Sequence, residues 1–230
     1  MELIFETKLG KVYQSDCLDY MRECKENEFD LCFTDPPYGI KVGRNKPFGK
    51  VGGNKPFGKV DGNKICEAKE YITFDDSKIP EKEIFDEIMR ISKNQIIFGG
   101  NYFIEYLKNT SCFLVWDKDN TGNFADCELA WTSFKTAVRK FKYRWNGLLQ
   151  ENMKNKETRY HPTQKPVELY AQILKKYSEP TQTVFDGFAG SGTLGVCCEQ
   201  LGMRYVLVEK KPEYCDIIIK RLKKVTNTLF

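Results

Sequence analysis

Apolar and polar positions alternate along the chain with two different periods, which divide it into strands and helices. Short apolar runs are typical of buried strands, whereas apolar residues three or four positions apart are typical of helices that cover a sheet. The pattern predicts seven strands, at 12–14, 30–34, 95–98, 113–116, 127–134, 183–185 and 205–208. It predicts helices at 18–25, 80–92, 102–108, 167–177, 193–201 and 212–224.

The order of these elements predicts an α/β fold, with a mixed, mostly parallel seven-stranded sheet and helices on both faces. No good helix lies between the strands at 113–116 and 127–134, so we expect these two to form an antiparallel pair. A length of 230 residues suits a single domain over 1–230. The sequence lacks both an apolar run of the roughly 20 residues that span a bilayer and a signal-peptide pattern. We therefore expect a cytoplasmic protein with no membrane partner.

Charge is unevenly distributed, although the net charge is only +4. The stretch 41–64 holds seven basic residues and one acidic residue, and the stretch 135–159 holds eight and two. Such clusters favour a polyanionic partner such as nucleic acid. Tyr143, Arg144 and Trp145 interleave charge with aromatic rings, so we expect 135–160 to be an irregular target-recognition region. Ordinary packing of Trp145 is the alternative.

The first basic stretch contains a tandem repeat. Residues 45–53 read NKPFGKVGG and residues 54–62 read NKPFGKVDG. Each unit has only two large apolar residues and cannot bury a core, so we expect a mobile surface loop over 41–64.

The chain has nine cysteines but a single histidine, His161, and no CxxC pair. This arrangement does not favour a zinc site, and we expect no metal. We expect the cysteines to be small, buried apolar side chains.

A glycine-rich turn, DGFAGSGT at 186–193, lies between a predicted strand and a predicted helix. Such a turn lets the backbone approach a ligand and exposes the first N–H groups of the helix. Glu209 ends the next strand, where a carboxylate can accept hydrogen bonds from ribose hydroxyls. The pattern predicts an adenosine-binding unit. Gly190, Gly192 and Gly195 also satisfy the GxGxxG spacing, so a nucleotide-dependent oxidoreductase remains an alternative.

The position of this turn in the chain bears on the fold. Only one further strand and one helix follow it, whereas a dinucleotide-binding fold needs several more. The missing strands must come from the N-terminal half, which implies a circularly permuted order.

The second motif is Asp35-Pro36-Pro37-Tyr38, at the carboxyl end of a predicted apolar strand. Open α/β sheets place their chemistry at this edge. Two prolines fix the backbone and remove two N–H donors, so a carboxylate and a proline carbonyl can accept both hydrogens of one amino group. An adjacent aromatic ring can stack on a planar base. The motif therefore predicts a site for an amino group on an aromatic ring.

DPPY, followed by DGFAGSGT and then YVLVE at 205–209, resembles the β group of DNA amino methyltransferases. SDC at 15–17, FGGNYF at 98–103, LVWDK at 114–118 and HPTQKP at 161–166 resemble further segments of that family. The resemblance covers nearly the whole chain. One departure is Gly187, where the family usually has proline.

The resemblance implies a circularly permuted Rossmann-like fold that binds S-adenosylmethionine. It gives the catalytic, base-binding role to Asp35, Pro36, Pro37 and Tyr38. It gives contacts with the cofactor to Asp16, Cys17, His161, Thr163, Lys165, Asp186, Phe188, Gly190, Ser191, Gly192 and Glu209.

The implied function is site-specific methylation of N6 of adenine in duplex DNA, by direct in-line transfer to a flipped-out base. Asp in the first position of DPPY is typical of adenine-N6 enzymes, whereas cytosine-N4 enzymes more often have Ser, so N4 of cytosine is the alternative. An RNA or protein substrate remains open as well. Double-stranded DNA is the expected partner. A cognate restriction enzyme, as in a restriction-modification system, and a second copy of the chain are further candidates.

Overall fold

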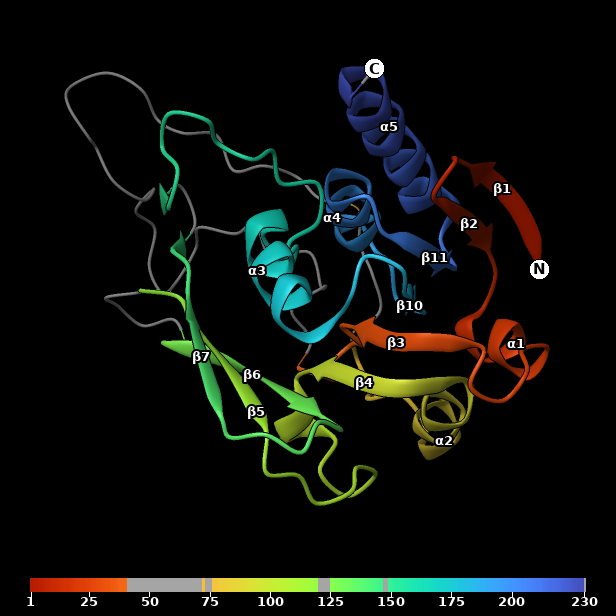
Figure 1. Cartoon of the computed structure of the whole chain (residues 1–230), viewed down its shortest axis with the longest axis vertical. Helices are drawn as coiled ribbons and strands as arrows, with labels where there is room; N and C mark the ends of the chain where they lie inside the picture. The colour runs from red at the N-terminus through yellow and green to blue at the C-terminus, as the bar shows by residue number, and fades with distance from the viewer. Residues whose placement is uncertain (41–71, 73–75, 120–124, 147–148, 230) are drawn as a thin grey trace.

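The computed structural model describes residues 1–40, 72, 76–119, 125–146 and 149–229. Most of these residues form one mixed sheet with helices on both of its faces (Figure 1). The expected loop over 41–64, with its tandem repeat, lies outside the described residues.

Within the described residues, nine strands form one sheet in the order β1-β2-β11-β10-β3-β4-β6-β5-β7. These strands are β1 (Glu2–Glu6), β2 (Gly10–Gln14), β3 (Phe29–Thr34), β4 (Ser92–Phe98), β5 (Phe113–Asp117), β6 (Cys127–Thr132), β7 (Arg139–Lys142), β10 (Thr183–Asp186) and β11 (Arg204–Glu209). A separate antiparallel pair consists of β8 (Trp145–Asn146) and β9 (Leu149–Gln150). The helices are α1 (Cys17–Arg22), α2 (Lys82–Ile91), η1 (Gly100–Tyr102), α3 (Val167–Tyr177), α4 (Thr193–Leu201) and α5 (Pro212–Leu229).

The two predicted motifs leave the sheet from neighbouring strands. β3 and β10 are parallel, with Leu31 opposite Val184 and Cys32 opposite Phe185. The carboxyl ends of parallel strands lie at the same edge of a sheet, so Asp35 and Asp186 start from the same edge. A strand from the start of the chain thus lies beside one from its end, which confirms the permuted order.

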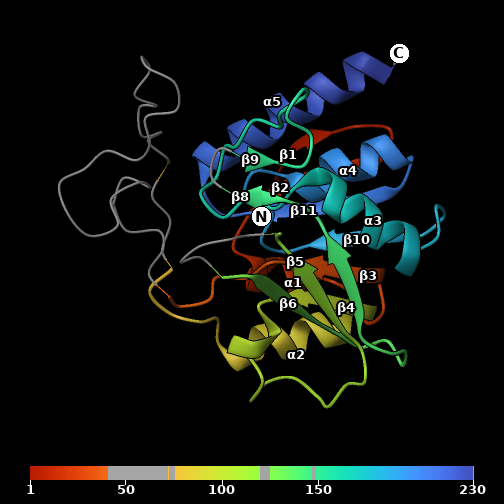
Figure 2. The ribbon, with the colours of Figure 1, turned by 90° about the vertical axis from the view of Figure 1, so that its left-hand side faces the viewer.

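The central strands are buried on both faces. On β3, Leu31 and Phe33 pack into a core with residues of α3 and α4, whereas Cys32 packs into a second core with residues of α1 and α2. Successive side chains of a strand point to opposite faces, so one apolar run serves both cores. Figure 2 shows the result as layers, with α3, α4 and α5 above β3 and β4 and with α2 below them.

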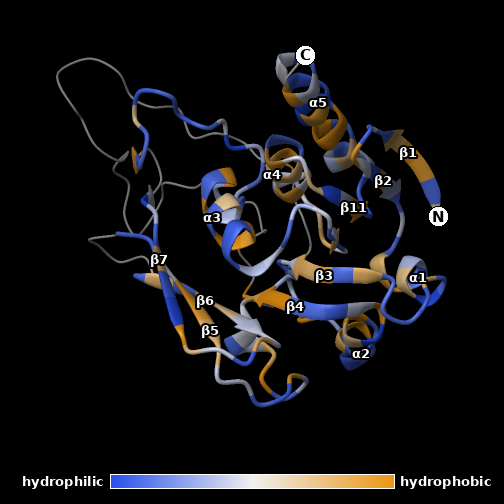
Figure 3. Ribbon diagram, in the orientation of Figure 1, coloured by the Kyte–Doolittle hydropathy of each residue, from blue (hydrophilic) through white to orange (hydrophobic). Residues whose placement is uncertain are grey.

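The prediction of seven strands is wrong, because β1 and β7 extend the sheet at its two edges. β1 pairs antiparallel with β2, and β7 pairs parallel with β5. The sequence of β7, RKFK, contains one apolar residue and therefore has no apolar run. Charged edge strands of this kind are common, since they discourage pairing with another chain. Figure 3 shows the contrast between polar β7 and the more apolar β5 and β6.

The expected antiparallel pairing of the strands near 113 and 127 is confirmed, and β6 is antiparallel to β4 as well. The helix expected at 102–108 is wrong. The chain forms only the short 3-10 helix η1 there, and then turns. Long-range contacts account for the difference: the Trp131 indole nitrogen donates to the Lys108 carbonyl at 2.8 Å, and Phe103 is buried. These contacts outweigh the marginal stability of a two-turn helix.

The expectation that 135–160 is irregular is wrong for β7, β8 and β9. Trp145 is only 5% exposed, and its indole nitrogen donates to the Gln164 carbonyl at 2.9 Å. Ordinary packing is therefore the correct interpretation of Trp145. Of the eight cysteines within the described residues, all except Cys127 are buried, as expected. No helix in the described part of the chain is long and apolar enough to cross a membrane.

Candidate active site

The glycine-rich turn connects β10 to α4 and contains two left-handed glycines, Gly190 (φ +52°) and Gly192 (φ +76°). Such backbone favours glycine, because other side chains are strained there. A Cβ on Gly192 would lie 3.0 Å from Ile218 of α5, so this glycine lets α4 and α5 pack closely. A Cβ on Gly190 would have no neighbour closer than 3.9 Å, the His161 ring. A side chain at this position would therefore touch the His161 ring across the small space beside Gly190.

Glu209, at the end of β11, closes one side of this space. Its carboxylate accepts the backbone N–H of Gly190 at 2.8 Å and that of Lys211 at 2.9 Å. Burial raises the pKa of Glu209, and these N–H donors oppose the rise. The backbone N–H of Ser15 donates a hydrogen bond to the Glu209 carbonyl at 3.1 Å, which brings the next residue, Asp16, close to Glu209. The Asp16 carboxylate caps α1 and pairs with Lys210 at 2.9 Å.

Asp186 connects the two motifs. Its Oδ1 accepts the Thr34 hydroxyl at 2.7 Å and the Phe188 N–H at 3.0 Å. Burial raises the pKa of Asp186 to about 7, although both donors favour the ionised form.

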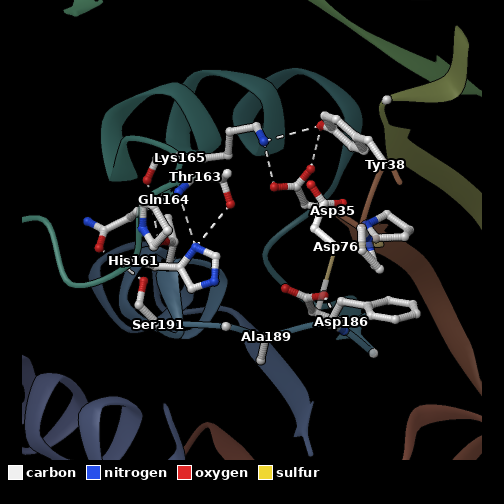
Figure 4. A pocket seen from close by; sticks show the side chains of 18 of the residues that line it. Asp35, Tyr38, Asp76, His161, Thr163, Gln164, Lys165, Asp186, Ala189 and Ser191 are labelled. Carbon is white, nitrogen blue, oxygen red and sulfur yellow. Dashed lines mark hydrogen bonds and ion pairs between the residues drawn. The ribbon is translucent and has the colours of Figure 1, made fainter. Parts of the chain in front are cut away.

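Asp35 and Tyr38 of the DPPY motif lie next to Glu128 and Lys165, which belong to other parts of the fold. We call the place where these four side chains meet the acidic corner. Asp35 Oδ1 accepts the Tyr38 hydroxyl at 2.6 Å, and Asp35 Oδ2 accepts the Lys165 ammonium at 2.5 Å (Figure 4). Lys165 lies 3.1 Å from Glu128 of β6 as well, and Glu128 also forms an ion pair with Lys118. We call Asp35, Glu128, Lys165 and Lys118 the charged cluster; it contains two carboxylates and two ammonium groups.

The members of the charged cluster shift one another's pKa values. Burial raises the pKa of Asp35, the positive charge of Lys165 lowers it, and the negative charge of Glu128 raises it. Burial alone would lower the pKa of Lys165, but the two carboxylates hold it above its usual value. Burial would raise the pKa of Glu128, but Lys165 and Lys118 hold it below its usual value. Burial and the nearby carboxylates raise the pKa of Tyr38 well above its usual value.

The Tyr38 ring packs against Gly99 and stacks on the Tyr102 ring, with 4.9 Å between centroids and 14° between planes. A Cβ on Gly99 would lie 2.2 Å from the Tyr38 ring, so glycine is required by both space and its φ of +71°. Tyr102 is 43% exposed and lies at the cavity wall.

The HPTQKP segment crosses the site just before α3. His161 Nδ1 accepts the Thr163 N–H at 3.2 Å. Burial lowers the pKa of His161 to about 3, helped by the positive charges of Lys165 and Lys211. Gln164 accepts the Ser191 hydroxyl at 3.1 Å and thereby ties this segment to the glycine turn.

Arg221 of α5 supports the same region. Its guanidinium donates to the Ser191 carbonyl at 2.7 Å and to Glu157 at 3.0 Å. Glu157 in turn accepts the N–H of Val167, the first residue of α3, at 3.0 Å. Arg221 thus holds the glycine turn and the start of α3 at a fixed separation.

One cavity of about 920 Å³ joins the glycine turn to the acidic corner. Of the fifteen residues predicted from sequence, fourteen line it, and Gly192 does not. Lys165, expected beside the cofactor, makes its contacts with Asp35 and Glu128. Sequence reasoning missed Glu128, Lys118, Arg221 and Glu157; of these, only Lys118 had a signal, as the last residue of LVWDK.

The basic stretch after β6 lies beside acidic residues. Lys140 of β7 pairs with Asp117 at 3.3 Å, and Lys142 pairs with Asp119 at 2.9 Å. Arg144 forms a further ion pair with Asp119. All three basic side chains are about half-exposed or more, so these ion pairs contribute little to stability.

Comparison with known proteins identifies the family. The model of the DNA methylase family of N6 and N4 methyltransferases matches residues 67–220. The chain belongs to this family. It is an S-adenosylmethionine-dependent DNA methyltransferase, and the alternative of an oxidoreductase is excluded.

Individual relatives agree with this assignment. The Type II methyltransferase M.HinfI of Haemophilus influenzae is 24% identical over 94% of this chain and 69% of its own length. The fold resembles that of the PvuII DNA methyltransferase, described as cytosine-N4-specific, with a TM-score of 0.60 and 16% identity over 98% of this chain and 93% of that one. It also resembles the M1.HpyAVI complex with S-adenosylmethionine, with a TM-score of 0.54 and 19% identity over 93% and 99%.

The cavity fits S-adenosylmethionine. Gly190, which has no side chain, lines the cavity next to a carboxylate, Glu209, that can accept hydrogen bonds from ribose hydroxyls. Phe188 adds an aromatic wall, and Asp16 a second carboxylate. The volume of about 920 Å³ is at the upper end of the range for ligand pockets, which leaves room for a base beside the cofactor.

Proposed function

We propose that this methyltransferase acts on N6 of adenine in duplex DNA and that Asp35 and the Pro36 carbonyl hold the target amine. The observation that supports the proposal most directly is the position of Asp35. It lies at the edge of the sheet next to Asp186 and lines the cavity of the glycine turn. A base in this cavity can place its amino group between the acidic corner and the cofactor.

The proposed methyl transfer is direct, so the protein forms no covalent bond with the substrate. The lone pair of an aromatic amine is delocalised into the ring, which makes the nitrogen a poor nucleophile. Two acceptors on its hydrogens favour a tetrahedral nitrogen and aim the lone pair away from the ring. S-adenosylmethionine supplies the methyl group as an electrophilic sulfonium. The protein holds the amine in line with that group, and Asp35 holds the proton that the nitrogen releases once it is methylated.

A base in duplex DNA must leave the helix to reach this cavity. Tyr38 is proposed to stack on it. The Tyr102 ring now covers one side of Tyr38, and its 43% exposure allows it to turn toward solvent when a base takes its place.

The cofactor contacts remain proposals for individual residues. Glu209 is proposed to bind the ribose hydroxyls, and Gly190 and Ser191 to approach the cofactor with their backbone. His161, Thr163, Asp16, Cys17 and Phe188 line the same half of the cavity. Asp186 is proposed to shape the methionine end. Lys165 is better placed to act on Asp35 than on the cofactor.

Adenine rather than cytosine rests on the Asp in the first position of DPPY. Methylation of duplexes that carry one candidate base, followed by mass spectrometry of the nucleosides, separates N6-methyladenine from N4-methylcytosine. N4-methylcytosine as the product would overturn the choice of base and leave the rest of the proposal intact.

The region 135–160 is proposed to contact DNA within a single catalytic domain over 1–230. Reversing the charges of Arg139, Lys140 and Lys142 should weaken binding to all duplexes alike and flatten its salt dependence by about one unit of slope per lost phosphate contact. An unchanged salt slope would place these residues away from DNA. A cognate restriction enzyme, a homodimer and a cytoplasmic location complete the proposal; the Type II label of M.HinfI supports the first.

Asp35→Ala tests the central claim. Its folding and its affinity for S-adenosylmethionine should stay close to wild type. Single-turnover methyl transfer should fall at least about 100-fold, since one preorganised acceptor in a transition state is worth roughly 3 kcal/mol. Asp35→Asn should also be slow, because its amide can present a donor to the amine. A variant that lost cofactor binding but kept the transfer rate would assign Asp35 to the cofactor instead.

A further inference from the structure

Lys165 lies deeper in the active site than its position in HPTQKP suggests. Its side chain is only 3% exposed, and its ammonium lies 2.5 Å from Asp35 Oδ2, 3.1 Å from Glu128 Oε2 and 3.3 Å from the Tyr38 hydroxyl oxygen. An ammonium has three N–H donors, and these three oxygens can take all of them. The hydrogen-bonding capacity of Lys165 is therefore directed at the acidic corner.

Glu128 reaches this corner from β6, and its Oε2 lies 3.1 Å from the Lys165 ammonium and 3.5 Å from the Tyr38 hydroxyl oxygen. It is held by Lys118 as well, so it stays anchored if Lys165 moves. The charged cluster contains two carboxylates and two ammonium groups, so a small shift of Lys165 from one carboxylate to the other leaves its net charge unchanged.

We propose that Lys165 is a positioning residue that keeps Asp35 ionised and correctly aimed, and that Glu128 receives Lys165 when the target amine takes its place on Asp35. The proposal rests on the role given to Asp35 above. It involves no covalent change: one N–H···O contact to Asp35 is exchanged for another, and Lys165 strengthens its contact with Glu128.

The physical reason is that only an ionised carboxylate accepts with both oxygens. A protonated Asp35 would present a donor to an amine that needs acceptors. Burial favours that protonated form, and the nearby ammonium of Lys165 opposes it. In this structure Tyr38 donates to Asp35 Oδ1 and Lys165 donates to Asp35 Oδ2, and each oxygen keeps one further lone pair. An N–H that arrives at Oδ2 competes with Lys165, whose ammonium lies 3.1 Å from Glu128, closer than the 3.5 Å between the Tyr38 hydroxyl and Glu128.

Burial raises the pKa of Asp35, and four charged or hydrogen-bonding neighbours modify it. Lys165, at the start of α3, lowers its pKa, and Glu128 of β6 raises it. Tyr38 donates to the carboxylate and thus favours the ionised form. Asp186 of β10 repels Asp35 when both are ionised. Removing the charge of Lys165 must therefore raise the pKa of Asp35, and removing the charge of Glu128 must lower it.

The experiment measures the rate of single-turnover methyl transfer at saturating S-adenosylmethionine from about pH 5.5 to 9. The acid limb is the part of this pH–rate profile in which the rate falls as the pH is lowered. Lys165→Met should be at least about tenfold slower at neutral pH, with the acid limb moved to higher pH. Glu128→Gln should move the acid limb to lower pH. Lys93→Met removes an exposed lysine whose partner is Asp30, and should superimpose on wild type. Melting temperature and cofactor affinity are measured for each variant.

The proposal is supported if the acid limb moves to higher pH in Lys165→Met and to lower pH in Glu128→Gln. A purely structural role of these residues would not shift the limb in opposite directions. Acid limbs that coincide with wild type in both variants overturn it, as does a Lys165→Met variant that loses cofactor affinity while its limb stays in place. If Lys165→Met does not fold, the direction of the Glu128→Gln displacement decides. The proposed function fails separately, when Asp35→Ala transfers methyl groups as fast as wild type.

Discussion

Thr34 and Asp186 are 152 residues apart, and the Thr34 hydroxyl donates to Asp186 Oδ1 at 2.7 Å. Thr34 precedes the DPPY motif and Asp186 begins the glycine turn, so this hydrogen bond connects the proposed base-binding half of the cavity to the proposed cofactor half. Asp186 is only 3% exposed. Burial of a carboxyl group has a consequence for stability that depends on pH.

Asp186→Asn should stabilise the protein at neutral and alkaline pH. Burial raises the pKa of Asp186 from 3.8 to about 7, so the folded state binds more protons than the unfolded state between these values. The contribution of Asp186 to stability therefore falls as pH rises through this window and is constant above it. Asn keeps an Oδ1 acceptor for Thr34 and Phe188 without the charge. We expect the melting temperature of the variant, minus that of wild type, to rise by several degrees from about pH 4 to 7, since each kcal/mol is worth about 2–4 °C in a domain of this size.

Thermal unfolding without cofactor, monitored by circular dichroism across that range, measures this difference. A difference that does not change with pH would show that Asp186 is ionised in the folded protein throughout. In that case the Thr34 and Phe188 donors outweigh its burial.

His161 should remain neutral at physiological pH. Burial lowers its pKa to about 3, and Lys165 and Lys211 add to the effect. Because it is the only histidine of the chain, its ring signals in a nuclear magnetic resonance titration need no further assignment. We expect these signals to stay constant from pH 8 down to about 5, below the ordinary range for an imidazole. A midpoint near the usual value of about 6.5 would contradict the burial of this ring.

Glu209→Gln should weaken binding of S-adenosylmethionine by about 1.5–3 kcal/mol, the cost of replacing a charged hydrogen-bond acceptor by a neutral one. The carboxylate accepts the N–H groups of Gly190 and Lys211, and it has lone pairs left for ribose hydroxyls. Glu213→Gln is the matched control, because Glu213 is exposed on the first turn of α5. Calorimetry should give an unchanged affinity for the control. Equal affinities for both variants would remove Glu209 from the cofactor site.

Much of this site could be predicted from the sequence, because its two motifs are local. Asp35 and Asp186 each end a short apolar run, and parallel strands bring such ends to one edge. Glu128 could not be predicted in this way. It lies within a strand, and it faces Lys165 because β6 is antiparallel to β4, which is a long-range pairing.

The errors in the fold have the same origin. Lys108 lies outside a helix because its carbonyl accepts from Trp131, 23 residues away. Trp145 is buried because of Gln164, 19 residues away, although its basic neighbours suggested a nucleic acid surface. β7 was missed because an edge strand needs no apolar run. Local pattern thus predicts the elements that are buried on both faces better than those at edges and in connections.

Gly99→Ala should impair catalysis more than stability. Gly99 has φ of +71°, and an added Cβ would lie 2.2 Å from the Tyr38 ring. Gly202, at the end of α4, has a nearly equal φ of +69°, but an added Cβ there meets nothing within 4 Å. Gly202→Ala therefore measures the cost of the strained backbone alone, on the order of 1 kcal/mol of unfolding free energy. The difference between the two variants isolates the displacement of Tyr38.

We expect both alanine variants to fold, and Gly99→Ala to be the less stable of the two in denaturant unfolding because its Cβ also displaces the Tyr38 ring. Only Gly99→Ala should also slow single-turnover methyl transfer, by about tenfold or more, since a small misplacement of a group that positions the substrate is costly. Its affinity for S-adenosylmethionine should be unchanged, because Gly99 contacts the Tyr38 side of the cavity and not the glycine turn. If Gly99→Ala transferred methyl groups as fast as Gly202→Ala, the position of the Tyr38 ring would not matter for the reaction. Tyr38 would then have no part in holding the base.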